Sequence, residues 1–225
     1  MHSLKTTFVF GTLLATSILS AGNAHAFAPA RRIDPLTQAY LGTEGHEWVR
    51  CQTSGPFAAQ STYTAVADVF AEKTAIHFTE IIGQASNDSN CLSQGQNFYT
   101  IEEYSDLYYD GQDSVSLLTR EISRSYAITF NQPYYVQTAN NLAACGFTNW
   151  ALNVRKQITT TAQVQKCLGL VTANIGQTLY EREKFDAQKN DISGLFTDTY
   201  TGVTPATRPV ALDVQNPFLY VSRKQ

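Results

Sequence analysis

Apolar and polar side chains alternate residue by residue through much of this chain, and this pattern constrains the fold more than any other feature. From Trp150 to Ile158 the apolar residues occupy every second position, with Lys156 as the only lapse. A period of two is typical of a β-strand with one buried face. A second run places the following residues on one face: Ile122, Arg124, Tyr126, Ile128 and Phe130.

The same pattern predicts strands over most of 63–70, 74–82, 98–109, 121–130 and 150–158. Shorter candidates are 167–172, 178–185, 192–197 and 210–214. The runs 63–70 and 74–82 are close enough to form a hairpin. Helix signals are confined to Pro35–Tyr40, with Asp34 as N-cap, and to 137–144. We therefore expect an all-β fold, an antiparallel meander β-barrel of about eight strands with a short N-terminal helical turn.

The first 26 residues have the pattern of a signal peptide. Lys5 precedes a twelve-residue apolar run, Phe8–Leu19, and small residues then lead to Ala24-His25-Ala26. A membrane anchor is the alternative, but a spanning helix needs about 20 apolar residues and the stretch after Leu19 is too polar. We expect cleavage after Ala26, a mature chain that starts at Phe27, export to the periplasm or the outside, and one barrel domain over 27–225.

The four cysteines are consistent with export. All of them lie in the expected mature chain, at Cys51, Cys91, Cys145 and Cys167. An even number in an exported protein indicates disulfides, and no two are spaced as zinc ligands are. We favour Cys51 with Cys91 and Cys145 with Cys167, because consecutive strands are usually neighbours in space. The two other connectivities, 51–145 with 91–167 and 51–167 with 91–145, remain open.

Charge and histidine content exclude several functions. The chain has 16 Lys and Arg against 19 Asp and Glu, a net charge of −3, which argues against a nucleic-acid partner. Only His46 and His77 remain after the signal, so zinc ligation and histidine general-base chemistry are disfavoured. Gly-x-Ser-x-Gly, P-loop and Gly-x-Gly-x-x-Gly motifs are absent from the sequence. We expect no metal and no cofactor.

The remaining polar clusters have ordinary interpretations. On a strand, His77 and Glu80 point to opposite faces and cannot share a metal, and His46-Glu47 reads as a polar pair in a loop. The densest acidic group consists of Glu102, Glu103, Asp106 and Asp110. A glycosidase pair or a calcium site is one interpretation of it, but an acidic solvent edge is favoured. Asn87-Asp88-Ser89 fits the glycosylation pattern, yet we interpret it as a turn.

Tyrosines are concentrated in one third of the chain. A tyrosine ring with a polar tip suits a cavity wall or a contact surface, and equally a strand face that meets water. The residues concerned are Tyr99, Tyr104, Tyr108, Tyr109, Tyr126, Tyr134 and Tyr135.

A Gly- and Trp-containing opening segment, Gly42–Cys51, is followed by the expected meander and by late arginines, Arg208 and Arg223. This arrangement resembles the calycin or lipocalin-like group, whose eight-stranded barrels bind small apolar ligands. In that group a late Arg packs on a Trp of the first strand, so the resemblance implies that Trp48 is that Trp and Arg208 or Arg223 the Arg. The Cys-Gly-x-x-x-Trp segment that ends at Trp150 is similar to one in exported bacterial proteins, and we expect a structural role for Trp150.

Three functions follow from different classes. The first is an exported barrel that binds a small apolar or amphipathic ligand, which a cavity of about 300 Å³ or more would favour. The second is an envelope structural or interaction protein with a filled barrel, which an exposed aromatic patch would favour. The third, a periplasmic hydrolase, is least favoured because histidines are scarce, and a cleft with converging carboxylates would revive it.

Overall fold

The computed structural model describes residues 32–86, 91–114, 116–171, 173–186, 191–194, 202–210, 212 and 218–223. Residues Ile33–Gln225 form one compact unit. The expected signal peptide, its cleavage site before Phe27 and the Asn87–Ser89 triplet lie outside the described residues, and the predictions for them stay predictions.

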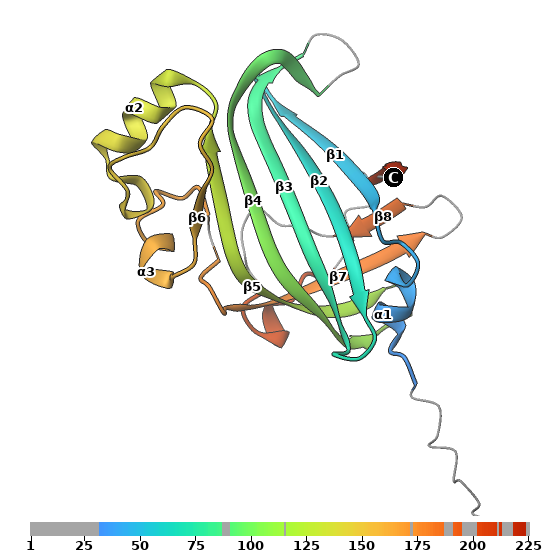
Figure 1. The fold of residues 1–225 in the computed structure, drawn as a ribbon. Helices are drawn as coiled ribbons and strands as arrows, with labels where there is room; N and C mark the ends of the chain where they lie inside the picture. Colours follow the sequence, from blue (N-terminus) through green and yellow to red (C-terminus); the bar gives the residue numbers. More distant parts are fainter. Residues whose placement is uncertain are drawn as a thin grey trace, which may run out of the picture. The chain divides into compact units, whose positions relative to one another are not determined.

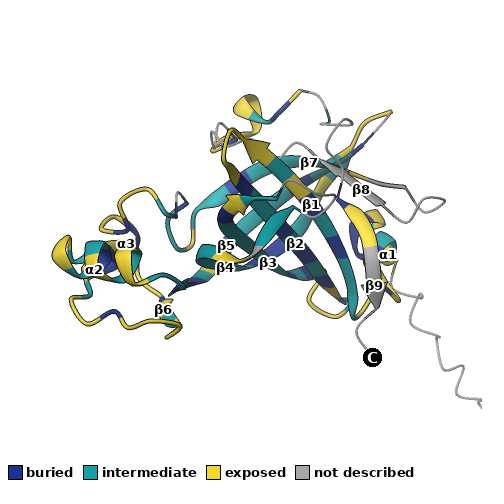
Figure 2. Ribbon diagram, turned by 90° about the horizontal axis from the view of Figure 1, so that it is seen from above, coloured by how far each residue is buried: buried dark blue, intermediate teal, exposed yellow. Residues whose placement is uncertain are grey.

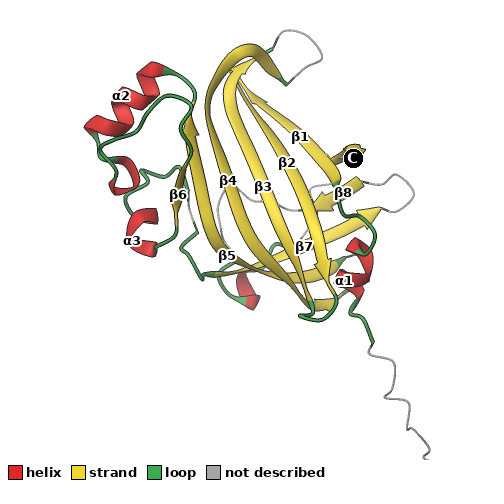
Figure 3. Cartoon of the chain, viewed as in Figure 1, coloured by secondary structure: helices red, strands yellow, loops and turns green. Residues whose placement is uncertain are grey.

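One antiparallel sheet dominates the fold (Figures 1 and 3). Its strand order is β8-β7-β5-β4-β3-β2-β1-β9, and β6 pairs with another part of β5. The all-β antiparallel prediction is confirmed, but the barrel is not, because within the described residues the sheet stays open between β8 and β9. The strands are β1 (His46–Ser54), β2 (Phe57–Asp68), β3 (Lys73–Ala85), β4 (Leu92–Gln112), β5 (Leu117–Phe130), β6 (Lys156–Ile158), β7 (Thr178–Asp186), β8 (Asp191–Gly194) and β9 (Leu219–Arg223).

Most predicted strands are present, with shifted ends. The hairpin of 63–70 and 74–82 is the β2–β3 pair, although β2 begins at Phe57 and ends at Asp68. The runs 98–109, 121–130 and 178–185 fall within β4, β5 and β7, and 192–197 overlaps β8. The prediction over 167–172 was wrong for its described residues, which form turns and bends rather than a strand, and the run 210–214 lies mostly outside the described residues.

The strand predicted over 150–158 was also wrong, since only Lys156–Ile158 is extended and paired. Asn153 adopts a left-handed conformation, with φ of 57°, which breaks an extended chain. Trp150 is buried, whereas Leu152 and Val154 are 44% and 47% exposed. The alternation there therefore reflects one anchored tryptophan, not a buried strand face.

Short helices flank the sheet. Helix α1 (Pro35–Tyr40) is confirmed, and the side chain of Asp34 caps it by accepting a 2.9 Å hydrogen bond from the Thr37 backbone N–H. Helix α2 (Pro133–Asn141) begins four residues before the predicted start, because Pro133 favours the first helical position. Helix α3 (Thr161–Val164) was not predicted. Helical turns cover Ala144–Gly146 and Pro205–Thr207. No helix in the described part of the chain has the length and apolarity that crossing a membrane requires.

We call the face of the sheet that carries Trp48, Tyr63, Ile76 and Leu107 the inner face, and the opposite one the outer face. All four residues are buried, and they form one core cluster with Leu36 and Tyr40 of α1 and with Phe218. A second cluster lies on the same face of β5, where Tyr126, Ile128 and Phe130 pack against the segment of α2 and α3. Figure 2 shows these buried positions along the strands and the exposed surfaces of α2 and α3.

The sheet curls back on itself. Tyr63 on β2 and Glu183 on β7 are joined by a hydrogen bond of 3.4 Å, although β3, β4 and β5 separate their strands in the sheet. Figure 1 shows β7 crossing behind β2 and β3. The inner faces of β2 and β7 therefore face each other, and their side chains meet between the strands.

A bulge in β5 determines which of its side chains lie on the inner face of the sheet. Tyr104 pairs with Ser125 but the next residue, Ser105, pairs with Ser123, so β5 has an extra residue at Arg124. Arg124 therefore does not share a face with Tyr126 and Ile128, and neither does Ile122. The prediction of one continuous face was wrong, and the bulge turns Ser123 and its neighbour Glu121 inward.

Both favoured disulfides are confirmed. Cys51 on β1 is bonded to Cys91, with Cα atoms 5.5 Å apart, and Cys145 is bonded to Cys167, with Cα atoms 4.0 Å apart. The first bond lies on the outer face, because Cys51 alternates with the inward Arg50. The second ties the turn after α2 to the end of α3. These bonds fit a non-cytoplasmic protein.

Candidate functional site

Besides Glu80, four glutamates point from the inner face into the interior of the curled sheet. Their inward direction follows from their cross-strand partners, since Glu103 lies opposite Phe78 and Glu121 opposite Leu107. Glu183 is 3% exposed, and the other three are half-buried. The sequence analysis considered only Glu103 of this group. The four residues are Glu103, Glu121, Glu181 and Glu183.

Glu183 is held by two tyrosines from other elements. Tyr40, at the end of α1, donates a 2.9 Å hydrogen bond to Oε2, and Tyr63 donates the longer bond to Oε1. Burial raises the pKa of Glu183 to about 7, although both hydroxyls lower it. The pKa values of Tyr40 and Tyr63 are raised well above their usual value, first by burial and then by the charge of Glu183.

Glu103 also has hydroxyl partners. Ser123 donates a 2.5 Å hydrogen bond to its Oε1. Burial, and then the charge of Glu121, raise the pKa of Glu103 to about 8, while the hydroxyls of Ser123 and Tyr126 act in the opposite direction. At neutral pH the protonated form of this carboxyl is thus favoured.

Glu121 and Glu181 form a carboxyl–carboxyl pair. Their side chains are hydrogen-bonded to each other, and Ser105 donates a further hydrogen bond to Glu121. Two ionised carboxylates are both acceptors, so this bond requires a proton on one of them. Burial raises the pKa of both, and that of Glu181 is raised further by the charges of Glu121 and Glu183. The two carboxyls therefore share one proton.

Two buried hydroxyls on the inner face make no hydrogen bond within the described structure. Thr119 lies opposite Glu181 in the β5–β7 ladder, and Thr74 lies opposite Leu107 in the β3–β4 ladder. Both side chains are fully buried, and their Oγ1 atoms are without a partner among the residues described. A buried hydroxyl without a partner costs free energy, which marks a place where a polar partner would be stabilised.

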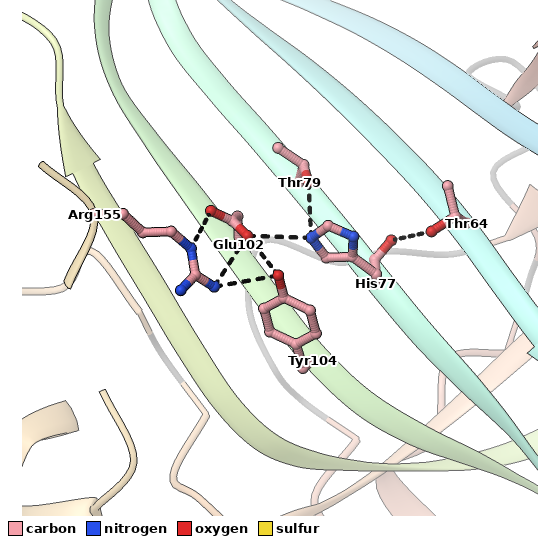
Figure 4. Close-up of polar contacts among 6 residues, drawn as sticks. All are labelled: Thr64, His77, Thr79, Glu102, Tyr104 and Arg155. Carbon is pink, nitrogen blue, oxygen red and sulfur yellow. Dashed lines mark hydrogen bonds and ion pairs between the residues drawn. The ribbon is translucent and has the colours of Figure 1, made fainter. Parts of the chain in front are cut away.

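On the outer face, by contrast, an acidic residue is paired with a cation (Figure 4). Arg155 donates hydrogen bonds of 2.8 and 3.2 Å to the two oxygens of Glu102, and Tyr104 donates one of 2.6 Å. His77 lies 3.4 Å from the same carboxylate and stacks on Tyr104, with ring centroids 4.4 Å apart. Burial opposes ionisation of Glu102, but the hydrogen bonds from Arg155 and Tyr104 outweigh it and the pKa is lowered.

The other outer carboxylates have cations too. Asp106 contacts Lys73 at 2.9 Å and Arg124 at 3.3 Å, and Asp110 contacts Arg120 at 3.0 Å and also Arg208. The acidic group of the sequence is thus split by the pleat, with Glu103 inside and the other three outside. Within the described residues, no set of three or more His, Cys, Asp or Glu side chains is placed to hold a metal ion.

A pocket opens on the inner face at the end of the sheet where β1 turns into β2. Its volume is about 410 Å³, and its wall mixes apolar and polar groups. It lies one pleat from the acidic cluster, because Glu80 in its wall is two residues from Phe78, the partner of Glu103. The lining residues are Gln52, Thr53, Ser54, Phe57, Ala58, Ala59, Glu80 and Ile82.

The two histidines, His46 and His77, lie in different surroundings. His77 is on the outer face and Glu80 on the inner face, as expected from their spacing. His46 begins β1 rather than lying in a loop, and its ring is 5.7 Å from that of Trp48 and 5.1 Å from that of Tyr220.

The resemblance to lipocalin-like proteins pointed to one tryptophan and two late arginines, and these residues lie in different parts of the fold. Trp48 is fully buried against Tyr40 and Tyr63. The Arg208 guanidinium lies 5.4 Å from the Tyr180 ring centre and bonds Asp110, far along the sheet from β1. Arg223 pairs with His46 in the β9–β1 ladder, two residues from Trp48, and the packing of a late Arg on Trp48 stays a prediction.

Trp150 organises the helical segment. Its indole N–H donates to the Ala144 carbonyl at 3.1 Å, and its backbone N–H and C=O both bond the Asn140 side chain. Its ring meets that of Phe130 edge-on at 4.8 Å.

The tyrosine-rich third of the chain does not form one surface. Tyr99, Tyr109 and Tyr126 lie on the inner face, and Tyr104 and Tyr108 on the outer face. The last two, Tyr134 and Tyr135, belong to α2.

No protein-family model matches the chain, and no curated protein matches it significantly. The assignment of a function therefore depends on the geometry of the inner face.

Proposed function

We propose that the protein is an exported, lipocalin-like barrel that binds a small amphipathic ligand on the inner face of its sheet. One observation carries the proposal: the enclosed face places an aromatic cluster around Trp48 and Tyr63 beside the carboxyls of Glu103 and Glu121. Ligand sites combine apolar walls with a few convergent polar groups in this way. The pocket of about 410 Å³ supplies an opening of suitable size.

Closure of the barrel is part of the proposal. The curl already brings the side chains of Tyr63 on β2 and Glu183 on β7 within hydrogen-bonding distance, and a barrel would require β8 and β9 to pair at the open seam. A barrel of about eight strands is just wide enough to hold side chains or one small ligand. Export is supported by the two disulfides, which persist in oxidising compartments.

Native mass spectrometry and tryptophan fluorescence test the proposal. The chain has only two tryptophans, so Trp150→Phe leaves Trp48 as a reporter of the inner face. The matched control, Trp48→Phe, reports only the helical segment. We expect a small molecule that co-purifies with the protein, and emission from Trp48 that changes when amphipathic compounds are added. Absence of any bound mass, together with an unresponsive Trp48, would contradict ligand binding.

The Glu121–Glu181 pair supports a second candidate, an acid–base hydrolase. A carboxyl pair that shares a proton can supply both an acid and a base. Turnover of a model ester or glycoside that disappears in Glu121→Gln would favour this candidate over simple binding.

A further inference from the structure

Glu103, Glu121, Glu181 and Glu183 lack cationic partners among the described residues, whereas Glu102, Asp106 and Asp110 on the outer face are paired with cations. Arg50 is a buried cation on the same inner face, and its guanidinium lies 4.5 Å from the centre of the Phe218 ring. The partners of the inner carboxyls are the hydroxyls of Ser105, Ser123, Tyr40 and Tyr63, or another carboxyl. Within the described residues none of the four inner glutamates forms a salt bridge. Buried carboxyls are normally paired with a cation or a metal, so this inner group resembles half of an ion pair.

The unpartnered hydroxyls are an independent sign at the same place. Thr119 Oγ1 and Thr74 Oγ1 are buried on the inner face, one beside Glu181 and the other in the cross-strand row of Glu121. A hydroxyl can accept a hydrogen bond from an N–H donor through its lone pairs. The carboxyl pair and the Thr119 hydroxyl together offer acceptors to one group that carries several N–H donors.

The surroundings favour an organic cation over a metal ion. No group of three or more ligating side chains converges in the described structure. Tyr63 and Phe78 belong to the adjoining aromatic cluster, and aromatic faces attract ammonium groups.

We propose that the inner face binds an alkylammonium compound, a primary amine on an apolar tail, with its N–H donors directed at Glu121, Glu181 and Thr119. The inference rests on the proposed function and adds the charge of the ligand. The apolar tail points along the inner face toward the pocket at the β1–β2 turn, which has a volume of about 410 Å³.

Three probes of equal chain length test the charge directly: decylammonium, decanol and decanoate, each below its micellar concentration. We expect decylammonium to bind at least about tenfold more tightly than the other two, since a hydrogen bond between charged groups is stronger than one between neutral groups. Trp48 fluorescence in the Trp150→Phe protein provides the readout. Equal binding of decanol would overturn the cation inference and leave ligand binding intact, whereas binding of none of the three would contradict the proposed function itself.

Two variants locate the ammonium group. Glu121→Gln should weaken decylammonium about tenfold or more and leave decanol unchanged, and Glu102→Gln on the outer face is the matched control with no effect. Thr119→Val retains the shape and removes the hydroxyl, so it should weaken decylammonium several-fold while the empty protein unfolds at the same or a higher temperature. Unchanged affinity in both inner-face variants would overturn the assignment.

Discussion

Glu102 and Glu103 are neighbours on β4, but the pKa of one is lowered and that of the other is raised to about 8. The pleat sends the first side chain outward to Arg155 and the second inward to Ser123. A guanidinium stabilises the ionised carboxylate, whereas a hydroxyl in an enclosed space does not offset the desolvation. The local partner, not the position in the sequence, decides the charge.

The protonated inner carboxyls predict that stability falls as pH rises. Glu103 keeps its proton in the folded state up to about pH 8, but loses it near pH 4.5 when unfolded. The folded state therefore binds more protons between these values, and the free energy of unfolding decreases by up to about 1.4 kcal/mol per pH unit for each such group. Glu103→Gln should flatten this decline, as measured by urea unfolding at pH 4 to 9.

Glu102→Gln is the comparison for that experiment. Its carboxylate is ionised and partly exposed, so the loss of its ion pair should cost about 1 kcal/mol or less. The slope between pH 5 and 8 should match that of the unchanged protein. A flattened slope in this variant, and not in Glu103→Gln, would reverse our placement of the proton.

Sequence reasoning reached part of the site at this scale. Glu103 was visible in an acidic group, and strict alternation along 98–109 could have separated it from Glu102. Glu181 and Glu183 were missed because they alternate with Arg182 and Lys184. When both faces of a strand are polar, alternation does not indicate which face points inward.

At the scale of elements, the segment from α2 to the turn after α3 depends on one disulfide. Cys145 and Cys167 are fully buried, and the loop between them spans 22 residues. In the chain-entropy view, closing such a loop stabilises the fold by about 3 kcal/mol. Replacing both cysteines by Ala should therefore raise amide hydrogen exchange over 133–171 and leave β3 and β4 protected. Replacing Cys51 and Cys91 should show the reverse distribution, with faster exchange in β1 and β2.

We expect the indole of Trp150 to stabilise this segment as much as the Cys145–Cys167 disulfide does. It is 4% exposed and fills the space between Phe130, Phe147 and the Ala144 turn. Trp150→Ala should lower the free energy of unfolding by about 3–5 kcal/mol. Trp150→Phe should cost less, because most of the packing remains. Denaturant titration followed by circular dichroism compares the two, and equal small losses would count against this role.

The error over 150–158 has a physical origin. Alternation reports burial of every second side chain, and here one deeply packed tryptophan followed by exposed apolar residues produced the same pattern. The bulge at Arg124 was equally invisible, because an inserted residue changes the facing of a strand without changing its composition. Hairpin pairing was predictable, since β2 and β3 are joined by a short turn.

At the scale of the whole molecule, the meander order followed from short connections between successive strands. The curl that faces β7 toward β2 did not, because it arises from accumulated twist and from contacts such as Tyr40 with Glu183. Closure between β8 and β9 stays a prediction for the same reason.

Export gives a prediction for the intact chain. When the protein is produced with its own N-terminus in a secreting bacterium, the exported product should lack residues 1–26 and begin at Phe27. Intact-mass measurement under non-reducing conditions reads the start of the chain and the two disulfides together. A start displaced by more than three residues would contradict the cleavage assignment.

The Cys51–Cys91 bond has a consequence for how the molecule resists force. It spans 40 residues and encloses the whole β2–β3 hairpin. If the two ends of the chain were pulled apart, that hairpin could not add to the extension, and about 140 Å of contour length would stay hidden at roughly 3.5 Å per residue. Only a reductant would release it, so the length gained in a stretching experiment should increase by about that amount when the bond is cut.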